Sequence, residues 1–424
     1  MIKPDLKFKA DNGNEFPDWR KKKFLDVFEN LNNSTFSRDC LNYEGGDAKY
    51  IHYGDILIKF GTSIDVQSSN IPYINENLSY EKYALLAEGD IVIADTAEDD
   101  TVGKTVEILN ANDKKVIAGL HTIACRPKEK FASKYLGYFM NADAYHNQLR
   151  PYMQGIKVTS ISKANIALTR ISIPSIQEQK KIADFLTVLD EVISNCQDTV
   201  KAWEERKKGV VQKLFSQKVR FKNDDGSDFP EWKEKKMSDI ALLFNGDRSS
   251  RYPKENEFVK SGIAFINTEN LHNTTLDINN KCKYINREKY NELSGVKIQL
   301  LDIIYCLRGS VGLCSLNTEL TEGTVASSLM VVRGMNDIVN PIYLYNFLNC
   351  SFVLKQVKQC LNGSCAGNLS AKEVGKFTVK IPSITEQKKI ADCLSALDDV
   401  INDYKKNLAA WEELRKGLLQ QMFV

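Results

Sequence analysis

The sequence contains no apolar run near the ~20 residues that a membrane-spanning helix needs. Its first residues, MIKPDLKFKADNGNEF, have no hydrophobic segment of the kind that signal peptides carry. The net charge is only +2, so no bulk positive field attracts the chain to nucleic acid or to an anionic membrane. We therefore expect a cytoplasmic protein with no membrane partner. Any polyanion would be held by local basic patches, or with the help of another protein.

Histidine is scarce, and cysteine lacks a regular framework. The four histidines do not stand at metal-ligand spacing from cysteine or glutamate, and the ten cysteines form no C-x-x-C pair. We expect no metal site and reduced, mostly buried thiols. With 43% hydrophobic and 26% charged residues, the 424-residue chain is typical of a globular protein of roughly two to four domains.

Complete catalytic motifs are also lacking. VGKT at 102–105 resembles the end of a phosphate-binding loop, but position 98, where the first glycine should stand, is Glu98. NPIY at 340–343 lacks the second proline of an amino-methyltransferase motif. A divalent metal for phosphodiester cleavage could be held by Asp95, Glu98, Asp99 and Asp100. The second half of the chain has no such group, so a solvated turn is the preferred interpretation, and a binding protein is predicted.

An internal repeat is the strongest pattern present. Residues 173–216 read IPSIQEQKKIADFLTVLDEVISNCQDTVKAWEERKKGVVQKLFS, and residues 381–424 read IPSITEQKKIADCLSALDDVINDYKKNLAAWEELRKGLLQQMFV. At an offset of 208, 24 of these 44 positions are identical. FKADNGNEFPDW (8–19) recurs as FKNDDGSDFPEW (221–232) at an offset of 213. The chain therefore alternates these shared segments with two divergent regions, 25–134 and 238–342.

The constant segments are predicted to be long helices. Ser175 and Glu178, like Ser383 and Glu386, have the S-x-x-E spacing of a capping box. Apolar residues then recur in steps of three and four, which favours a coiled-coil seam of about 60 Å. Two separate amphipathic helices, each lying on its own domain, are the alternative. The predicted seam, in which both tryptophans pack rather than meet a ligand, comprises Ile182, Leu186, Leu189, Ile193, Val200, Trp203, Ile390, Leu394, Leu397, Ile401, Leu408 and Trp411.

The divergent regions predict an α/β (α+β) fold. Short runs rich in β-forming residues recur between loops rich in Gly and Ser, and helical stretches follow near 133–150 and 341–361. The predicted strands lie within 55–60 (DILIKF), 90–95 (DIVIAD), 302–307 (DIIYCL) and 328–333 (SLMVVR).

Loops that combine Gly, Ser, Thr or Asn with basic residues suit contact with a phosphate backbone, and Arg or Lys can bond guanine edges. They are GTSIDVQSSN (61–70), GIKVTSIS (155–162), NGDRSSRY (245–252), LRGS (307–310) and NGSCAGNLS (362–370). The candidate DNA contacts in and beside these loops are Lys59, Thr62, Ser63, Lys157, Thr159, Ser160, Arg248, Arg251, Arg308, Ser310, Asn368 and Lys372.

Two divergent regions separated by I-P-S-I-x-E-Q-K-K-I-A helices, each continuing into W-E-E, resemble the specificity (S) subunit of type I restriction–modification systems. The likeness covers essentially the whole chain. It implies a pseudo-two-fold repeat with target-recognition domains at 1–172 and 219–380, and antiparallel coiled-coil helices at 173–218 and 381–424.

The resemblance also implies a role. Each recognition domain would read one half of a bipartite, asymmetric site in double-stranded DNA, while the helices fix the spacing and dock partners. Those partners would be two modification (methyltransferase) and two restriction (nuclease and translocase) subunits. S-adenosylmethionine, ATP and Mg²⁺ would belong to them, leaving this chain non-catalytic and without a cofactor. The alternatives are a coiled-coil adaptor that does not bind DNA, and a single-chain nuclease or methyltransferase.

Overall fold

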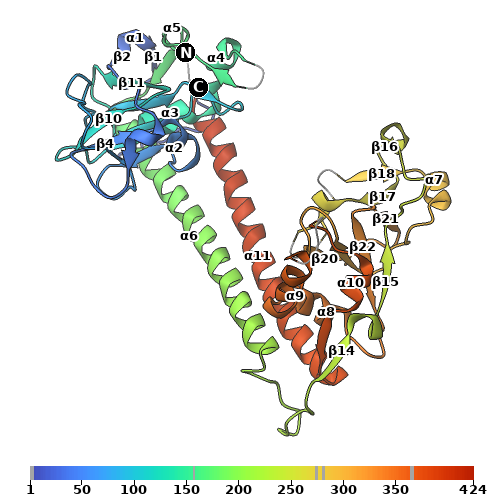
Figure 1. Ribbon diagram of the computed structural model, residues 1–424. Coiled ribbons are helices and arrows are strands. Elements are labelled where there is room, and N and C mark those ends of the chain that lie inside the picture. The colour runs from blue at the N-terminus through green and yellow to red at the C-terminus, as the bar shows by residue number, and fades with distance from the viewer. Residues whose placement is uncertain (1–3, 156–157, 273–275, 279–281, 363–366) are drawn as a thin grey trace. The chain divides into compact units, whose positions relative to one another are not determined.

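The computed structural model describes residues 4–155, 158–272, 276–278, 282–362 and 367–424. Two compact units are present: unit 1 contains Met1–Gln197 with Lys406–Val424, and unit 2 is Asp198–Lys405. The division falls inside both long helices, α6 (Ile176–Phe215) and α11 (Ile384–Met422) (Figure 1). The four-segment organisation inferred from the sequence stays a prediction.

Unit 1 is built on two mixed β-sheets. The order β2-β11-β7-β9-β5 forms the larger sheet, and β10-β4-β6-β3 forms the smaller one. Two antiparallel pairs, β1-β13 and β8-β12, complete the unit. Its strands are β1 (Arg20–Lys23), β2 (Phe28–Asn30), β3 (Leu41–Asn42), β4 (Ala48–Ile51), β5 (Ser63–Asp65), β6 (Tyr73–Ile74), β7 (Ile91–Ala94), β8 (Thr96–Ala97), β9 (Thr105–Leu109), β10 (Lys115–Ala118), β11 (Thr122–Pro127), β12 (Thr159–Ser160) and β13 (Arg170–Ile173).

The short α-helices in the described part of unit 1 are α1 (Phe24–Val27), α2 (Tyr53–Ile58), α3 (Tyr135–Asn141), α4 (Asp143–Leu149) and α5 (Lys163–Ile166). Helix α3 packs on β9 of the larger sheet. The buried side chains of Ile93 and Phe139 belong to one continuous core, which also contains Leu186 from the start of α6. The first turns of the long helix are therefore part of the globular core.

Unit 2 repeats this plan. Its sheets have the orders β15-β22-β19-β20 and β16-β18-β17-β21, with β14-β23 as a separate antiparallel pair. The strands are β14 (Lys233–Lys236), β15 (Ala241–Asn245), β16 (Phe258–Val259), β17 (Ile263–Ile266), β18 (Lys283–Ile285), β19 (Ile303–Cys306), β20 (Cys314–Leu316), β21 (Gly323–Val325), β22 (Leu329–Gly334) and β23 (Thr378–Ile381). The shorter helices are α7 (Arg287–Glu292), α8 (Pro341–Leu348), α9 (Ser351–Asn362) and α10 (Ala371–Gly375).

The two units share topology where their sequences diverge. A parallel strand pair lies in the four-stranded sheet of unit 1, β4 with β10, and an equivalent pair lies in the β16-β18-β17-β21 sheet of unit 2, β17 with β21. A bidentate ion pair with a buried carboxylate also recurs: Arg126 binds Asp90 at 2.9 and 2.7 Å, and Arg333 binds Asp302 at 2.7 and 2.7 Å. The repeat therefore extends into the regions that the sequence comparison leaves unmatched.

Three of the predicted strands are confirmed by β7, β19 and β22, and the predicted helical stretches contain α3, α4, α8 and α9. The strand predicted at 55–60 is wrong, because residues 55–58 belong to α2 and residues 59–60 follow it outside any strand. The His52 side chain accepts a hydrogen bond from the Gly54 N–H at the start of this helix, and the buried Asp55 carboxylate binds Arg38 at 2.7 and 2.9 Å. These contacts override the β propensity of the isoleucines, one of which, Ile58, is 87% exposed.

Nine cysteines lie among the described residues and all are free, four of them buried and five half-buried. Fewer than half of these thiols are therefore buried, and the prediction of mostly buried thiols is wrong for the described residues. Cys365 lies outside the described residues. Within the described part of the chain, no helix is long and apolar enough to cross a membrane.

The repeated E-Q dipeptide anchors each long helix to its unit. Gln179 accepts a hydrogen bond from the Ala132 N–H at 2.9 Å, and Gln387 accepts one from the Asn340 N–H at 2.8 Å. Each glutamine also donates to the carbonyl of the proline just before the helix, at 3.0 Å. The shared motif thus ties the helix start to the chain segment that leads into α3 or α8.

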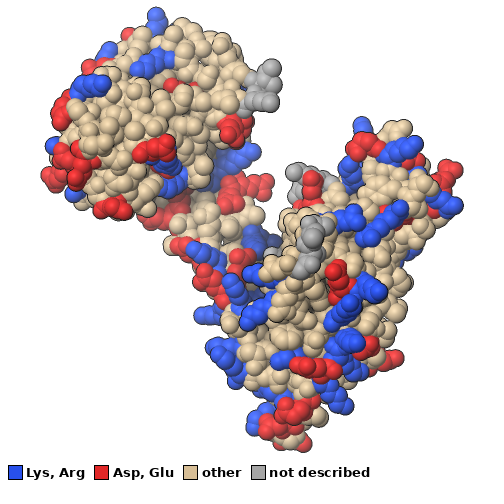
Figure 2. Space-filling view, viewed as in Figure 1, with Lys and Arg blue, Asp and Glu red and all other residues tan. Residues whose placement is uncertain are grey.

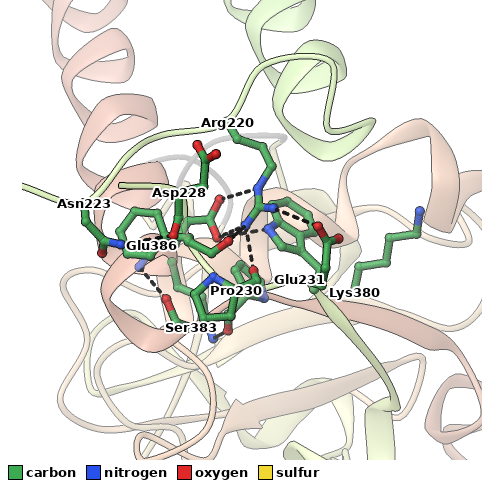
Figure 3. A network of polar contacts seen from close by, with 12 residues as sticks. Arg220, Asn223, Asp228, Pro230, Glu231, Lys380, Ser383 and Glu386 are labelled. Carbon is green, nitrogen blue, oxygen red and sulfur yellow. Dashed lines mark hydrogen bonds and ion pairs between the residues drawn. The ribbon is translucent and has the colours of Figure 1, made fainter. Parts of the chain in front are cut away.

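The predicted capping boxes form only in part. The hydroxyl oxygens of Ser175 and Ser383 each accept a hydrogen bond of 3.3 Å from the N–H three residues later. The Glu386 carboxylate does not return to the cap. It instead accepts hydrogen bonds from Arg220 and Trp232, a network drawn in Figure 3. The chain from Arg220 to Trp232, which contains the second copy of the FKADNGNEFPDW segment, therefore contacts α11 through Glu386.

Each unit contains an antiparallel pair of α6 and α11 segments. In unit 1 the Arg415 guanidinium lies 2.5 Å from the Asp190 carboxylate, and in unit 2 the Lys207 ammonium lies 2.5 Å from the Asp398 carboxylate. Gln197 with Glu412, and Lys405 with Glu204, form a second equivalent set. In both sets the residue numbers rise along one helix as they fall along the other, as antiparallel pairing requires.

A buried carboxylate, Glu107, caps α3 in unit 1. Its two oxygens accept hydrogen bonds from the Lys134 and Gly137 N–H groups at 2.7 and 2.9 Å. Only 1% of Glu107 is exposed, and burial raises its pKa from 4.5 to about 7. Burial thus outweighs the two hydrogen bonds, which by themselves would lower the pKa.

This raised pKa predicts a pH-dependent stability of unit 1. Between pH 4.5 and 7 the unfolded chain releases a proton that the folded unit retains, so the free energy of unfolding should fall by roughly 3 kcal/mol and then level off. Glu107→Gln should remove most of this slope, and Glu98→Gln, at an exposed position, should keep it. Hydrogen exchange of the β7 and β11 amides across this pH range measures the effect; an equal slope in Glu107→Gln would contradict it.

Candidate nucleic-acid interface

Four segments meet at one end of the sheets in unit 1. The Gly119 N–H donates to the Ile51 carbonyl at 3.0 Å, which joins the end of β10 to the end of β4. The Asp95 N–H donates to the His121 carbonyl at 3.1 Å, and the Ile161 N–H donates to the Asp95 carbonyl at 2.9 Å. We call this region, residues 52–53, 95–97, 119–121 and 159–161, the unit 1 junction.

Unit 2 builds the same framework at the equivalent place. The Ala326 N–H donates to the Ile266 carbonyl at 2.8 Å, and the Leu307 N–H donates to the Ser328 carbonyl at 2.9 Å. The Leu369 N–H donates to the Leu307 carbonyl at 2.9 Å. Residues 267–268, 307–310, 326–328 and 367–369 form this unit 2 junction. Each hydrogen bond has its counterpart in unit 1, so the backbone of the two junctions is alike.

The side chains of the unit 1 junction form a polar and aromatic group. The Thr96 hydroxyl donates to Asp95 Oδ1 at 2.8 Å, and His121 Nδ1 lies 3.5 Å from the same oxygen. The His121 ring meets the Tyr53 ring edge-on, with centroids 5.3 Å apart. About half of the His121 side chain and a quarter of the Asp95 side chain are exposed, so these polar atoms are available to a partner.

The unit 2 junction carries different side chains on the same frame. Arg308 is exposed, and among the residues that the structure describes its guanidinium has no hydrogen-bond or ion-pair partner. The Thr268 and Ser328 hydroxyls lie 3.4 Å apart. A hollow of about 1040 Å³ adjoins the loop and is lined by Ser310 and by the paired Lys207 and Asp398. This junction therefore offers hydroxyls and an unpaired cation.

The residues predicted from the sequence in unit 1 are only partly brought together. Thr159 and Ser160 form β12 and pair with β8 inside the junction. Lys59 follows α2, and its ammonium group contacts the Tyr43 hydroxyl at 2.7 Å. Thr62 and Ser63 lie instead beside Glu107 of β9, where the Glu107 N–H donates to the Thr62 carbonyl. Lys157 lies outside the described residues.

In unit 2 the predicted residues Arg308, Ser310 and Asn368 lie in the junction. Arg248 and Arg251 are exposed in the loop after β15, which is anchored next to the junction because the Gly246 N–H donates to the Leu329 carbonyl at 3.1 Å. Arg251 also donates to the Glu292 carbonyl at 3.1 Å. Lys372 is exposed on α10, which follows the junction directly.

Sequence reasoning missed Tyr53, Thr96 and His121, and it interpreted Asp95 as part of a solvated acidic turn. His121 has a φ of 54°, a left-handed conformation that is uncommon outside glycine and often marks functional loops. No pattern in the sequence predicts this angle. Within the described part of the chain, no group of three or more His, Cys, Asp or Glu side chains could hold a metal ion.

Charge is interspersed on the face of the molecule that Figure 2 shows. In unit 2, Lys and Arg alternate with Asp and Glu, and large areas of unit 1 carry neither sign. Many cations are already paired, for example Arg287 with Glu322 and Lys283 with Glu255. On this face, therefore, no single sign of charge covers either unit.

The residues predicted for the helix seam divide between two environments. Ile182, Leu186, Leu189 and Ile193 are buried in the core of unit 1, and Ile390 and Leu394 are buried in that of unit 2, with Leu397 packed against it. Val200 and Ile401 are buried as well. Trp203 stacks on Tyr404 in unit 2, while Leu408 and Trp411 pack against the core of unit 1. The coiled-coil architecture predicted from the sequence is confirmed, and the first turns of each helix in addition pack on the core of a globular unit.

The chain is thus a repeated α/β protein whose two units carry unlike side chains on one loop framework. Comparison with known proteins identifies the family. The family described as "Type I restriction modification DNA specificity domain" matches residues 17–201 and 230–410. The chain therefore belongs to the type I restriction–modification specificity family.

Individual relatives agree with this assignment. The putative type I restriction enzyme MjaX specificity subunit of Methanocaldococcus jannaschii is 23% identical over 97% of this chain and 94% of its own length. The crystal structure of a type I restriction–modification S subunit from M. genitalium covers 100% of this chain and 99% of its own, with 16% identity and a TM-score of 0.55. A chain from a structural study of type I R-M complex assembly and conformational transition covers 96% and 98%, with 14% identity and a TM-score of 0.59.

Proposed function

We propose that this chain is the DNA sequence-recognition subunit of a type I restriction–modification complex, and that each unit reads one half of a bipartite, asymmetric site in double-stranded DNA. The observation that carries the proposal is the pair of junctions. They share a backbone framework but present different side chains, as two readers of different half-sites require. In addition to the junction residues, we propose DNA contacts by Lys59, Thr62, Ser63, Lys157, Arg248, Arg251 and Lys372.

The long helices set the spacing between the half-sites in this proposal and dock two methyltransferase subunits. Two weak readers on one chain gain affinity through effective concentration, but only at a site whose halves have the matching separation. The modest surface charge fits a division of labour, in which the partner subunits supply part of the grip on the DNA phosphates. S-adenosylmethionine, ATP and Mg²⁺ belong to the methyltransferase and restriction subunits, and this chain contributes recognition without catalysis.

The test is to co-express the chain with its methyltransferase subunit and map methylated sites across the host genome. A bipartite motif with two unlike halves and a fixed spacer is expected. Absence of any sequence-specific methylation by the assembled complex would favour a structural adaptor. Turnover of DNA by the pure chain with S-adenosylmethionine or Mg²⁺ would favour a single-chain enzyme.

Arg308→Ala should alter one half-site alone. Because a bidentate Arg–guanine contact contributes about 1–3 kcal/mol of discrimination, the preference at one base pair should weaken by roughly 5- to 150-fold. Lys260→Ala, at an exposed position after β16, is the matched control and should leave both halves unchanged. Methylation mapping measures both variants, and an unchanged motif in Arg308→Ala would remove this residue from the interface.

A further inference from the structure

Equivalent positions of the two junctions differ in hydrogen-bonding character. The residue after the central strand is Asp95 in unit 1 and Leu307 in unit 2, and both use their N–H and carbonyl groups in the same pair of backbone hydrogen bonds. The next residue is Thr96 in unit 1 and Arg308 in unit 2. Unit 1 thus presents a carboxylate, a hydrogen-bond acceptor, at the first of these two positions. Unit 2 presents a guanidinium, a hydrogen-bond donor, at the second.

The carboxylate is not needed to build the junction. Leu307 closes the same framework in unit 2 with a side chain that is 0% exposed and packed in the core. Asp95, by contrast, leaves about a quarter of its side chain exposed and places it among polar groups. A residue with a purely structural task here could be apolar, so the carboxylate in unit 1 calls for a different explanation.

The neighbours of Asp95 orient the carboxylate and leave one oxygen available. The Thr96 hydroxyl and His121 Nδ1 both approach Oδ1, at 2.8 and 3.5 Å. Oδ2 has no hydrogen bond among the described residues. The Tyr53 ring packs edge-on against His121 and limits the orientations of the imidazole. The group is therefore an oriented acceptor rather than a mobile surface charge.

From this geometry we infer that Asp95, oriented by Thr96 and His121, accepts a hydrogen bond from an exocyclic amino group of cytosine or adenine in the major groove of the half-site read by unit 1. The inference rests on the proposed function and names the chemistry at one of its two readers. In the major groove, cytosine N4 and adenine N6 are the amino donors, and carboxylates pair with them. Arg308 supplies the opposite chemistry in unit 2, where guanine O6 and N7 are acceptors.

The experiment uses the full chain co-expressed with its methyltransferase subunit. Asp95→Asn and Asp95→Leu, the second of which copies unit 2, should each weaken the preference at one base pair of one half-site by roughly 5- to 150-fold. The other half-site should be unchanged. Asp99→Asn is the matched control, because Asp99 is exposed just beyond β8 and, among the described residues, its carboxylate accepts hydrogen bonds from Thr101 of its own turn alone.

Synthetic duplexes then identify the amino group. At the affected position, adenine is replaced by purine, or cytosine by 2-pyrimidinone, so that hydrogen stands where the amino group was. Binding by the wild-type complex should weaken by a similar factor, and binding by the Asp95→Leu complex should be insensitive to the replacement. Equal sensitivity of both complexes would overturn the inference.

The remaining outcomes are also decisive. A wild-type methylation motif in both Asp95 variants would overturn the inference. Assembled Asp95 variant complexes that methylate no site would overturn it too, because the loss of a base-reading residue should change which sequence is methylated rather than abolish methylation. Should the Asp95 variants fail to assemble, His121→Asn, which tolerates a left-handed φ, must alter the same half-site. A wild-type complex with no bipartite motif would instead overturn the proposed function itself.

Discussion

Replacing Arg220 by alanine should destabilise unit 2 by about 3 kcal/mol. Its guanidinium donates to both oxygens of Glu386, at 3.1 and 2.9 Å, and also to the Pro230 carbonyl at 2.7 Å (Figure 3). Glu386 is 0% exposed, so the variant leaves a buried carboxylate with Trp232 as its remaining donor at 3.1 Å. Removing one partner of a buried ion pair is costly because the other charge stays desolvated.

Unit 1 supplies the matched control for this prediction. Lys7 stands where Arg220 stands in unit 2, but its ammonium group donates to the Phe16 carbonyl rather than to the buried glutamate. Glu178 has no hydrogen bond to either carboxylate oxygen among the described residues, and burial raises its pKa. Lys7→Ala should therefore cost much less than Arg220→Ala, since it breaks no ion pair.

Because the chain has two units, a single melting temperature does not report on either one. Native-state hydrogen exchange separates them. In Arg220→Ala the amides of β14 and β23 should lose protection, while those of β1 and β13 in unit 1 keep it. Equal losses from Arg220→Ala and Lys7→Ala would show that the ion pair contributes nothing beyond the local backbone contacts.

The sequence predicts the long helices and the docking motif well because these features are local or repeated. Steps of three and four along 173–216 and 381–424 predict the helices that the structure contains. The strands β7, β19 and β22 are short runs of apolar, β-forming residues, and their position in the structure is the one that these runs predict. The repeat is recognisable because 24 identities among 44 positions at one offset cannot arise from composition alone. These successes depend on short-range periodicity and on counting identities.

The junctions could not be predicted in this way. Tyr53, Asp95 and His121 are far apart in sequence, and they meet only because β4, β7 and β10 end at one place in the sheets. Strand order and register are set by long-range pairing, which single-sequence patterns do not encode. Arg308 could be predicted as a DNA contact from the sequence, because a basic residue in a loop with Gly and Ser is a local pattern. The failure at 55–60 has the same origin, since the Arg38–Asp55 ion pair joins separate segments.

Phe423→Ala should destabilise unit 1 by about 3–5 kcal/mol, as expected for removal of a fully buried phenylalanine. The ring is 2% exposed and meets Tyr135 and Phe139 edge-on, with centroids 6.1 and 5.7 Å away. Phe215 makes the equivalent contacts in unit 2, with Tyr343 and Phe347 at 5.5 and 5.3 Å. The end of each long helix thus completes a globular core at the same structural position.

The consequence is that unit 1 cannot reach full stability from the first half of the chain alone, because part of its core lies at residues 422–423. In Phe423→Ala, exchange protection should fall in α3 and in the α6 segment Ile176–Gln197, and remain in β19 and β22 of unit 2. Phe215→Ala should give the reverse pattern. Gln421→Ala, which changes an exposed side chain beside Met422, is the matched control and should alter neither unit. Unchanged protection of α3 in Phe423→Ala would mean that the core of unit 1 closes without the end of α11, and that the repeated F at 215 and 423 has a task other than packing.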